Sequence, residues 1–213
     1  MELEDRIYAF SQREAFVNIK DHKPNHMNNT QCRLLNPAKS DMGKISKVIL
    51  SRVVDSIRSI KRYNQWKNSF SVINWFNALQ GKKELSFIEF DIVDFYPSIT
   101  EKVLNNALDW AKTLTEISDE ERDIILQTKK TILFFDGQCW VKKGNKPFDV
   151  SMGSWDGAEV ADLIGLFLLS QLQEVDCDLG LYRDDGLGVT PLSPRLAEKE
   201  KQKICKIFQK KWI

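Results

Sequence analysis

The sequence has 213 residues, of which 42% are hydrophobic, so it is long enough for one domain with a real core or for two small lobes that share one. The net charge of +1 does not by itself indicate a nucleic-acid-binding protein. However, residues 13–83 contain 14 lysines and arginines against four acids, which leaves −9 for the remainder. Such a division suits a protein that binds phosphates with one part and metal ions with the other, although a solvated basic helix face gives the same pattern.

The cysteines and the apolar runs bear on cellular location. The four cysteines form no C-x-x-C pair and follow no secretory signal, which predicts free thiols in a reducing compartment. His22, His26 and Cys32 lack the second close pair of ligands that a zinc site needs. No apolar run reaches transmembrane length, and the acidic, polar residues 1–10 do not resemble a targeting peptide. We therefore expect an intracellular protein, cytoplasmic or nuclear and not secreted, without a membrane partner.

The first predicted elements are two strands over residues 16–33, joined by a loop rich in Asn, His and Pro. Lys20, Lys23 and Arg33 flank this loop. An amphipathic helix is predicted over residues 43–63, because apolar residues recur there at helical spacing. A template backbone could lie along its basic residues, which are Lys44, Lys47, Arg52, Arg58 and Lys61. A further helix is predicted over residues 69–79, with large side chains typical of a core: Phe70, Ile73, Trp75 and Phe76.

Residues 87–100 combine a strand with acidic side chains. Ile88, Phe90 and Ile92 are expected to point to one face of this strand, and Asp91 to the other. Asp91 thus lies near the end of a strand that we expect to be buried, where an isolated charge is costly. A divalent cation is the commonest partner of clustered carboxylates. A strand-end aspartate can equally be a cap or a surface residue.

Two helices and a hairpin are predicted next. Thr100 is expected to cap the first helix, and residues 118–121 form a capping box that begins the second. The pair Asp136-Gly137 predicts a two-residue turn between strands over residues 131–135 and 138–142. These three predictions rest on local rules, so they do not depend on which fold the chain adopts.

Two glycine-containing segments follow. In residues 151–172, Gly153 precedes an apolar helix, where a glycine could let a ligand approach the backbone or could only begin the helix. Residues 181–189 predict a strand, an acidic tight turn and a strand, with Gly186 free to take a positive φ. An Asp-Asp-Gly turn is often only a turn, but together with Asp91 it indicates a two-metal phosphoryl-transfer site.

Three segments, in this order and at this rough spacing, resemble catalytic motifs of reverse transcriptases. Residues 91–99 (DIVDFYPSI) are similar to the first catalytic motif, residues 151–163 (SMGSWDGAEVADL) to the glycine-containing motif, and residues 182–185 (YRDD) to the Tyr-x-Asp-Asp motif. The resemblance extends from about residue 18 to the end of the sequence. Met152 stands where many reverse transcriptases have glutamine, which points to retroelement enzymes of the Penelope-like or a neighbouring group.

The resemblance implies an α+β fold in which residues 86–213 form a polymerase palm, an antiparallel sheet backed by helices, and residues 1–85 a basic fingers lobe. It also implies RNA-directed DNA polymerase activity, in which the 3′-OH of a primer on an RNA or DNA template attacks an incoming dNTP. The family's primer grip and thumb would follow residue 213, so we expect a longer or separate chain to supply them.

The resemblance further implies the residues of the site. Two Mg²⁺ ions, for which Mn²⁺ could substitute, would be held by Asp91 and Asp184, with Asp185 completing the cluster and the Ile92 carbonyl as an extra ligand. An arginine of the fingers suits a triphosphate because its planar fork binds phosphate bidentately. The implied nucleotide-binding residues are Lys20, Lys23, Arg33, Tyr96 and Gly153. The implied template- or primer-binding residues are Lys44, Lys47, Tyr182 and Arg183.

Two alternatives stay open. RNA-dependent RNA polymerases share this architecture, but they typically carry a second aspartate five residues after the catalytic one, to contact the ribose 2′-OH. Tyr96 occupies that position here, and a bulky ring would block a 2′-OH and favour DNA synthesis, unless Tyr96 is a core aromatic. The other alternative is a truncated or domesticated relic that binds nucleic acid without catalysis.

Overall fold

The computed structural model describes residues 15–21, 27–28, 30, 32–36, 40–140 and 147–212, without the side chains of 133–135 and 210–212. Lys23 lies outside the described residues.

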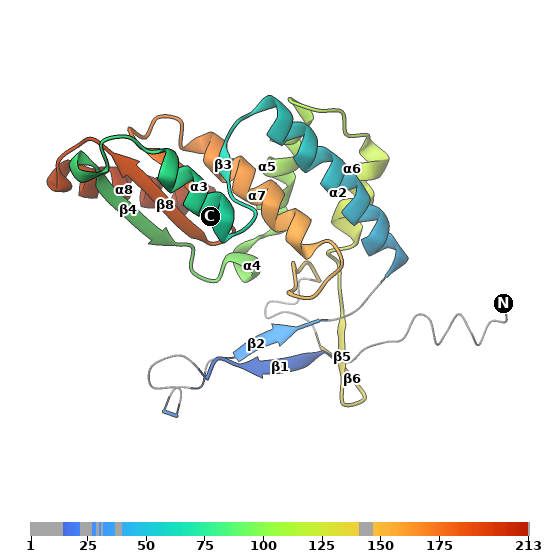
Figure 1. The fold of residues 1–213 in the computed structure, drawn as a ribbon. Coiled ribbons are helices and arrows are strands. Elements are labelled where there is room, and N and C mark those ends of the chain that lie inside the picture. Colours follow the sequence, from blue (N-terminus) through green and yellow to red (C-terminus); the bar gives the residue numbers. More distant parts are fainter. Residues whose placement is uncertain are drawn as a thin grey trace. The chain divides into compact units, whose positions relative to one another are not determined.

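Figure 1 shows the helices and strands of the described residues. In chain order they are β1 (Phe16–Ile19), β2 (Cys32–Leu35), α2 (Asp41–Ile60), β3 (Asn64–Gln65), α3 (Ser69–Ala78), the short 3-10 helix η1 (Lys82–Glu84), β4 (Ser86–Asp91), α4 (Phe95–Ser98), α5 (Glu101–Lys112), α6 (Asp119–Gln127), β5 (Leu133–Phe135), β6 (Gln138–Trp140), α7 (Gly157–Gln171), β7 (Asp178–Tyr182), β8 (Asp185–Thr190) and α8 (Pro194–Trp212).

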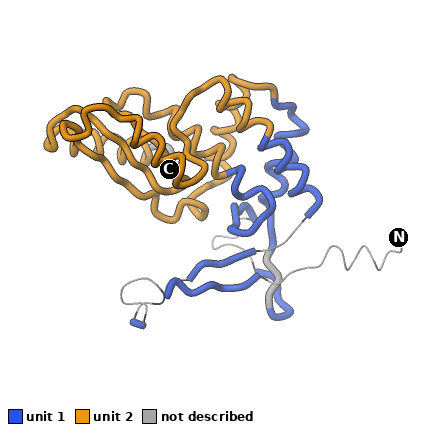
Figure 2. The backbone as a smooth tube through the Cα atoms, in the orientation of Figure 1, with its two compact units in different colours: residues 1–51, 117–160 blue, residues 52–116, 161–213 orange. Residues whose placement is uncertain are grey.

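The chain forms two compact units, and each is built from two separate stretches of sequence (Figure 2). Unit 1 comprises residues 1–51 and 117–160, and unit 2 comprises residues 52–116 and 161–213. A unit of this kind is defined by contacts between residues and is not a functional lobe. The predicted division into a fingers lobe of residues 1–85 and a palm of residues 86–213 therefore stays a prediction.

A four-stranded sheet with the order β3-β7-β8-β4 lies at the centre of unit 2. β4, β8 and β7 are antiparallel neighbours, whereas the two-residue strand β3 pairs with β7 in parallel. Ile88 and Leu181 are buried on one face of this sheet. Helix α8 packs against the same face, since the rings of Phe90 and Phe208 lie 5.6 Å apart at an angle of 63°. The α+β prediction, with a sheet backed by helices, is confirmed.

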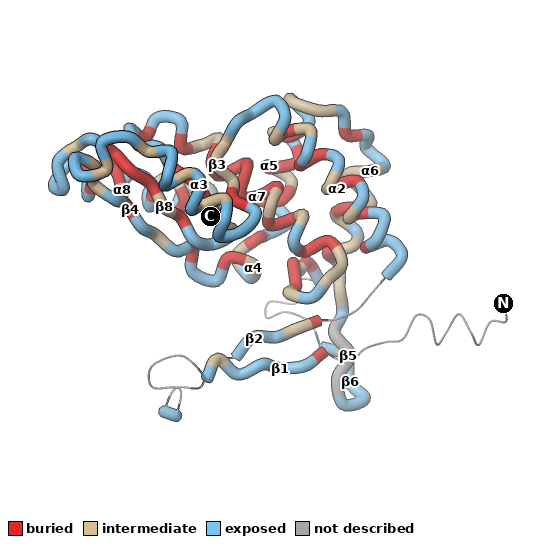
Figure 3. Tube along the Cα trace, viewed as in Figure 1, coloured by how far each residue is buried: buried red, intermediate tan, exposed pale blue. Residues whose placement is uncertain are grey.

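Buried apolar residues of unit 2 gather along α5 and α7, whereas exposed residues dominate the hairpin of β1 and β2 in unit 1 (Figure 3). Helix α5 buries one complete stripe, as its periodicity predicts: Val103, Leu104, Ala107, Leu108 and Ala111. Within the described residues, no helix has the length and apolar character needed to cross a membrane.

The local signals in the sequence form as predicted. Thr100 caps α5 by accepting a hydrogen bond from the Val103 amide at 3.2 Å. Ser118 and Glu121 make both hydrogen bonds of a capping box at the start of α6. Asp136 and Gly137 take φ values of 50° and 69°, as a two-residue hairpin turn with two left-handed positions requires. The first strand beside this turn begins at Leu133, two residues later than predicted, and residues 141–142 of the second lie outside the described residues.

The prediction that α3 belongs to the core is wrong. None of its residues is buried, and Phe70 and Ile73 are 75% and 51% exposed. The ring of Trp75 lies 5.1 Å from that of Trp66, and its indole N–H donates to Asp178 at 3.0 Å. The ring of Phe76 lies 6.1 Å from that of Phe87. These aromatic contacts hold the helix at the surface, and none of its residues is buried.

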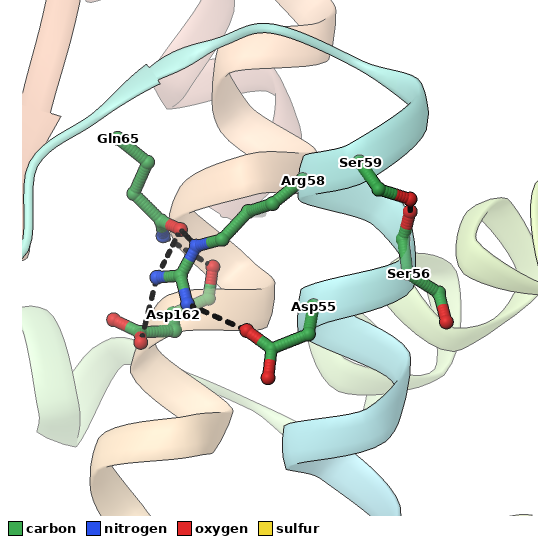
Figure 4. Close-up of polar contacts among 6 residues, drawn as sticks. All are labelled: Asp55, Ser56, Arg58, Ser59, Gln65 and Asp162. Carbon is green, nitrogen blue, oxygen red and sulfur yellow. Dashed lines mark hydrogen bonds and ion pairs between the residues drawn. The ribbon is translucent and has the colours of Figure 1, made fainter.

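Arg58 is likewise not available to a template, contrary to expectation. Its side chain is 19% exposed, and its guanidinium donates to Asp162 at 2.9 Å and to Gln65 at 2.7 Å (Figure 4). A carboxylate oxygen of Asp55, on the same helix, lies 3.6 Å from a guanidinium nitrogen of Arg58. These contacts join α2 to α7 and β3 within unit 2, because the planar fork of arginine can serve several acceptors at once.

Candidate functional site

Three acidic residues come together where β4 ends and β8 begins. Asp91 is the last residue of β4 and stands directly opposite Asp185, the first residue of β8. Asp184 precedes it in the turn, and its carbonyl accepts a hydrogen bond from the Ile92 amide at 2.9 Å. Because paired residues of antiparallel strands lie about 4.5–5.5 Å apart at Cα, two stretches distant in sequence bring the backbones of Asp91 and Asp185 together, with both side chains on one face of the sheet.

The turn between β7 and β8 forms differently from the prediction. Arg183, not Gly186, takes the positive φ, at 56°, as the first residue of the two-residue loop Arg183-Asp184. Gly186 lies inside β8, where an added Cβ would stand 2.1 Å from the ring of Phe90. Gly186 is thus needed because the ring of Phe90 approaches its backbone closely from the neighbouring strand. The left-handed residue of the turn is Arg183, which precedes the strand.

Repulsion between like charges is built into this cluster. The pKa of Asp185 is raised, first because burial removes water from its carboxylate, and then because Asp184, Asp91 and Glu89 carry the same charge. Asp91 itself is exposed, so the argument that its charge is buried and must be paired is wrong. Its side chain lies on the open face of the sheet together with that of Glu89.

The described side chains do not gather around a metal position. Among the described residues, no group of three or more His, Cys, Asp or Glu side chains is close enough to hold a metal ion. Metal binding by Asp91, Asp184 and Asp185 therefore stays a prediction, as does the Ile92 carbonyl as a ligand. All three residues are exposed, so their side chains can change rotamer at little cost.

Tyr96 follows the cluster in the short helix α4. The residue before this helix, Asp94, has a left-handed backbone with φ of 51°, which is uncommon outside glycine. This strained position turns the chain sharply after β4. Phe95 is 2% exposed and fills the core, whereas Tyr96 is half-buried, with its ring 5.8 Å from that of Phe95. Tyr96 is therefore not a fully buried core aromatic.

The predicted nucleotide-binding residues of unit 1 lie on two connected segments. Lys20 follows β1 and is half-buried, and Arg33 is exposed on β2, opposite Asn18. Gly153 is exposed and has φ of 95°, a conformation that few other residues adopt. The Asn36 amide, just after β2, donates to the Met152 carbonyl at 2.9 Å. The basic hairpin is thereby tied to the glycine segment through the main chain.

Lys44 and Lys47 lie beside the same glycine segment. Their ammonium groups stand 5.7 and 5.9 Å from the centre of the Trp155 ring, within the range of a cation–π contact. Each also has an acidic neighbour, Asp41 at 3.2 Å and Glu159 at 3.4 Å, so their charges are partly neutralised. Template contact by these lysines stays a prediction.

Tyr182 and Arg183 lie at the β7–β8 turn. Arg183 is exposed, and its guanidinium carbon stands 5.9 Å from the Tyr182 ring centre. The pair thus presents a cation and an aromatic ring directly beside the acidic cluster. A role in template or primer binding stays a prediction for both residues.

One set of buried polar residues was missed by the sequence reasoning. Asp156 forms an ion pair with Lys129, and both side chains are 1% exposed. Ser46 donates to the same carboxylate at 2.5 Å, and Thr128 donates at 3.2 Å. The only signal was an aspartate at the start of an apolar helix, which by itself indicates a helix cap. The sequence does not show that a lysine 27 residues earlier reaches it in the core.

No protein-family model and no curated protein matches this sequence. Solved structures do. The fold is similar to that of telomerase from Candida tropicalis truncated from its C-terminal domain, with a TM-score of 0.56, 15% identity and 76% of this chain covered. It is also similar to the RNA-dependent RNA polymerase of a human picobirnavirus, as an insertion-loop deletion mutant, with a TM-score of 0.58, 12% identity and 87% of this chain covered.

This chain spans 36% of the length of that telomerase and 38% of that viral polymerase. At such low identity the likeness concerns the fold, and both matches contain a polymerase palm. The antiparallel strands β4, β8 and β7 with their covering helices are therefore a palm fold. Within this fold, Asp91 and Asp185 are paired at one end of the strands β4 and β8, with Asp184 in the adjoining turn.

Proposed function

We propose that the chain forms the palm and part of the fingers of an RNA-directed DNA polymerase, a reverse transcriptase of retroelement type. Its reaction is nucleotidyl transfer from a dNTP to the 3′-OH of a primer on an RNA or DNA template. The observation that carries the proposal is the pairing of Asp91 with Asp185 across β4 and β8, with Asp184 in the adjoining turn. The palm fold and the Tyr-Arg-Asp-Asp turn support the same conclusion.

The donor chemistry of this cluster suits two Mg²⁺ ions. Magnesium prefers carboxylate and water oxygens. Burial and, after it, the neighbouring negative charges raise the pKa of Asp185, and a cation would favour its ionised form. Asp91 and Asp184 would hold the ions, with Asp185 and the Ile92 carbonyl beside them; Mn²⁺ could replace Mg²⁺. When bound, the ions would lower the pKa of the primer 3′-OH and neutralise charge on the leaving pyrophosphate.

The remaining roles belong to side chains outside the cluster. Arg33 and Lys20 would bind the triphosphate, the first through its planar fork and the second as a point charge. Gly153 would admit a sugar or base pair close to the backbone. Because the chain spans under two-fifths of the matched polymerases, we propose that a thumb comes from a longer or separate chain.

RNA synthesis is the second candidate function, and the likeness to a viral RNA-dependent RNA polymerase favours it. Tyr96 opposes it, because a half-buried ring five residues after Asp91 would leave little room for a ribose 2′-OH. A domesticated protein that binds nucleic acid without catalysis is the third candidate. Primer extension separates all three.

The test measures primer extension on RNA and DNA templates with Mg²⁺ or Mn²⁺, for the chain alone and for a version that carries a thumb. We expect dNTP incorporation that is lost, by about a thousandfold or more, in Asp91→Asn and Asp185→Asn, since each removes charge from the site of reaction. Asp123→Asn, an exposed aspartate of α6, is the matched control. In parallel, Mg²⁺ should raise the thermal midpoint of the wild type and of the control but not of Asp91→Asn. Retained extension in both cluster variants would falsify the catalytic assignment.

A further inference from the structure

We propose that Asp156 is a positioning residue: its buried ion pair with Lys129 sets the conformation of the glycine loop, residues 151–155, on which nucleotide binding depends. The inference rests on the proposed polymerase function. It assigns a role to the one fully buried charge pair among the described residues, which no step of the proposed reaction uses. Lys129 and Asp156 both belong to unit 1, as does the loop.

The carboxylate of Asp156 is saturated by donors from separate segments. Ser46 reaches it from α2, and Lys129 and Thr128 reach it from the end of α6. Asp156 itself is the last residue before α7. One side chain therefore joins the first turns of α2, the last turn of α6 and the start of α7 at the point where the glycine loop ends.

The beginning of the loop is held by the same lysine residue through its main chain. The Lys129 carbonyl accepts a hydrogen bond from the Asp149 amide at 2.8 Å, and Lys130 forms a β-bridge with Phe148. Just before the loop, Asp149 binds the main chain of Lys129. Just after the loop, Asp156 binds the Lys129 ammonium group. Both ends of the loop are fixed to one residue, so its conformation follows the position of Lys129.

Between these anchors the loop makes contacts within itself and with the first stretch of unit 1. Inside it, Ser154 donates to the Ser151 carbonyl at 3.0 Å, and the Ser151 hydroxyl, although buried, has no hydrogen-bond partner among the described atoms. The Met152 carbonyl accepts from the Asn36 amide, beside the hairpin that carries Arg33, and the Trp155 ring lies under the ammonium groups of Lys44 and Lys47. A shift of the anchors would therefore displace both Gly153 and its connection to the hairpin.

Stability alone does not account for this arrangement. Burial lowers the pKa of Lys129, which shows that its surroundings oppose the charge, and the attraction of Asp156 opposes that shift. Replacing a buried ion pair by apolar residues of similar volume is often neutral or stabilising. A charged pair in a dry core is thus a poor way to gain stability but a good way to specify one geometry.

The double variant Lys129→Met with Asp156→Leu separates positioning from stability. We expect it to fold, with a thermal midpoint near that of the wild type, while amide hydrogen exchange over residues 150–157 becomes at least about tenfold faster, because the loop loses its anchor. In primer extension the KM for dNTP should rise about tenfold or more, with a smaller change in kcat, since the loop positions the nucleotide and does not react. Ser46→Ala, which removes one hydrogen bond and keeps the charge pair, should give a smaller change of the same kind.

The matched control is Arg58→Met with Asp162→Leu, which removes a partly exposed ion pair of unit 2 and should leave exchange over residues 150–157 unchanged. Unchanged exchange or unchanged KM in the Lys129/Asp156 double variant would overturn the inference. If that variant does not fold, Ser46→Ala decides by the same two readouts. If the wild type does not extend primers, the proposed function fails, and hydrogen exchange still decides whether the pair positions the loop.

Discussion

Carboxylates occur in two opposite settings in this protein. In unit 1, Asp156 is 1% exposed and receives hydrogen bonds from Ser46, Thr128 and Lys129. In unit 2, Asp91, Asp184 and Asp185 are exposed, stand beside one another, and form no ion pair with a lysine or arginine of the described residues. The first carboxylate is satisfied by the protein itself, whereas the second set keeps an unfavourable interaction.

This difference in environment distinguishes Asp156, a carboxylate that serves the structure, from the three carboxylates of the acidic cluster, which we propose serve function. A buried carboxylate must be paired, since the alternative costs several kcal/mol, so the network around Asp156 follows from folding. Nothing in folding requires three acids at the end of β4 and β8. The pKa of Asp185 is raised, first by burial of its carboxyl group and then by the like charges of Asp184, Asp91 and Glu89, and a bound cation would oppose both effects. A bound cation would compensate the negative charges of the cluster, whereas the charge of Asp156 is already compensated by Lys129. The cluster, and not Asp156, is therefore the proposed metal site.

The largest expected effect comes from breaking the satisfied charge. Asp156→Leu alone would leave the Lys129 ammonium buried without a counter-ion and should lower the free energy of unfolding by about 3–5 kcal/mol. Chemical denaturation monitored by circular dichroism measures this loss. Adding Lys129→Met to the variant should recover most of it. A loss below about 1 kcal/mol in the single variant would mean that water reaches the ammonium, and that the pair is not a dry ion pair.

The sequence predicts those parts of the two regions that depend on neighbours along the chain. The capping box of Ser118, the Asp136-Gly137 turn and the alternation of Ile88 with Asp91 all follow from local rules, and the structure confirms them. The acidic turn after Tyr182 was predicted for the same reason. That Asp91 and the Asp184-Asp185 turn belong to one site was inferred from the two acidic segments together and from the family resemblance, because spacing alone does not fix which strands pair.

The sequence does not predict contacts made across the core. Lys129 and Asp156 each have an ordinary local interpretation, and only packing brings them together. Gly186 was assigned to the turn, whereas its role is to admit the ring of Phe90 from the neighbouring strand. The apolar pattern of α3 indicated burial, yet Phe70 is exposed, because hydrophobic periodicity does not say whether a partner surface exists.

A second prediction concerns the sugar that the acidic cluster would accept. Tyr96→Val, made in a version that carries a thumb, should raise incorporation of rNTPs relative to dNTPs by about tenfold or more, because it removes the ring that would overlap a 2′-OH. The ratio of kcat/KM values for the two nucleotides measures the effect. If the half-buried ring of Tyr96 instead serves only packing, the variant will lose up to roughly 3 kcal/mol of stability with an unchanged ratio, and the preference for DNA synthesis then loses its main support.

The smallest expected effect is a pH dependence that distinguishes the two regions by sign. The pKa of Asp185 is raised above its usual value of 3.8 in the folded protein, so the native state binds this proton more tightly than the unfolded state does. The stability of the metal-free protein should therefore fall as the pH rises from about 3.8 through the raised pKa. The pKa of Lys129 is lowered from 10.5, so its contribution should rise with pH between the lowered value and 10.5.

The variant Asp185→Asn isolates the acidic part of this dependence. It should abolish the fall in stability on the acidic side and leave the alkaline rise intact, as measured by urea denaturation at a series of pH values without metal. Lys129→Met with Asp156→Leu should do the reverse, and Asp123→Asn should change neither. Saturating Mg²⁺ should flatten the acidic part in the wild type, since a bound cation replaces the repulsion among Asp91, Asp184 and Asp185 with attraction. Parallel curves for the wild type and Asp185→Asn would show that the three carboxylates do not repel one another in solution, and the argument that they are arranged for a cation would then lose its electrostatic basis.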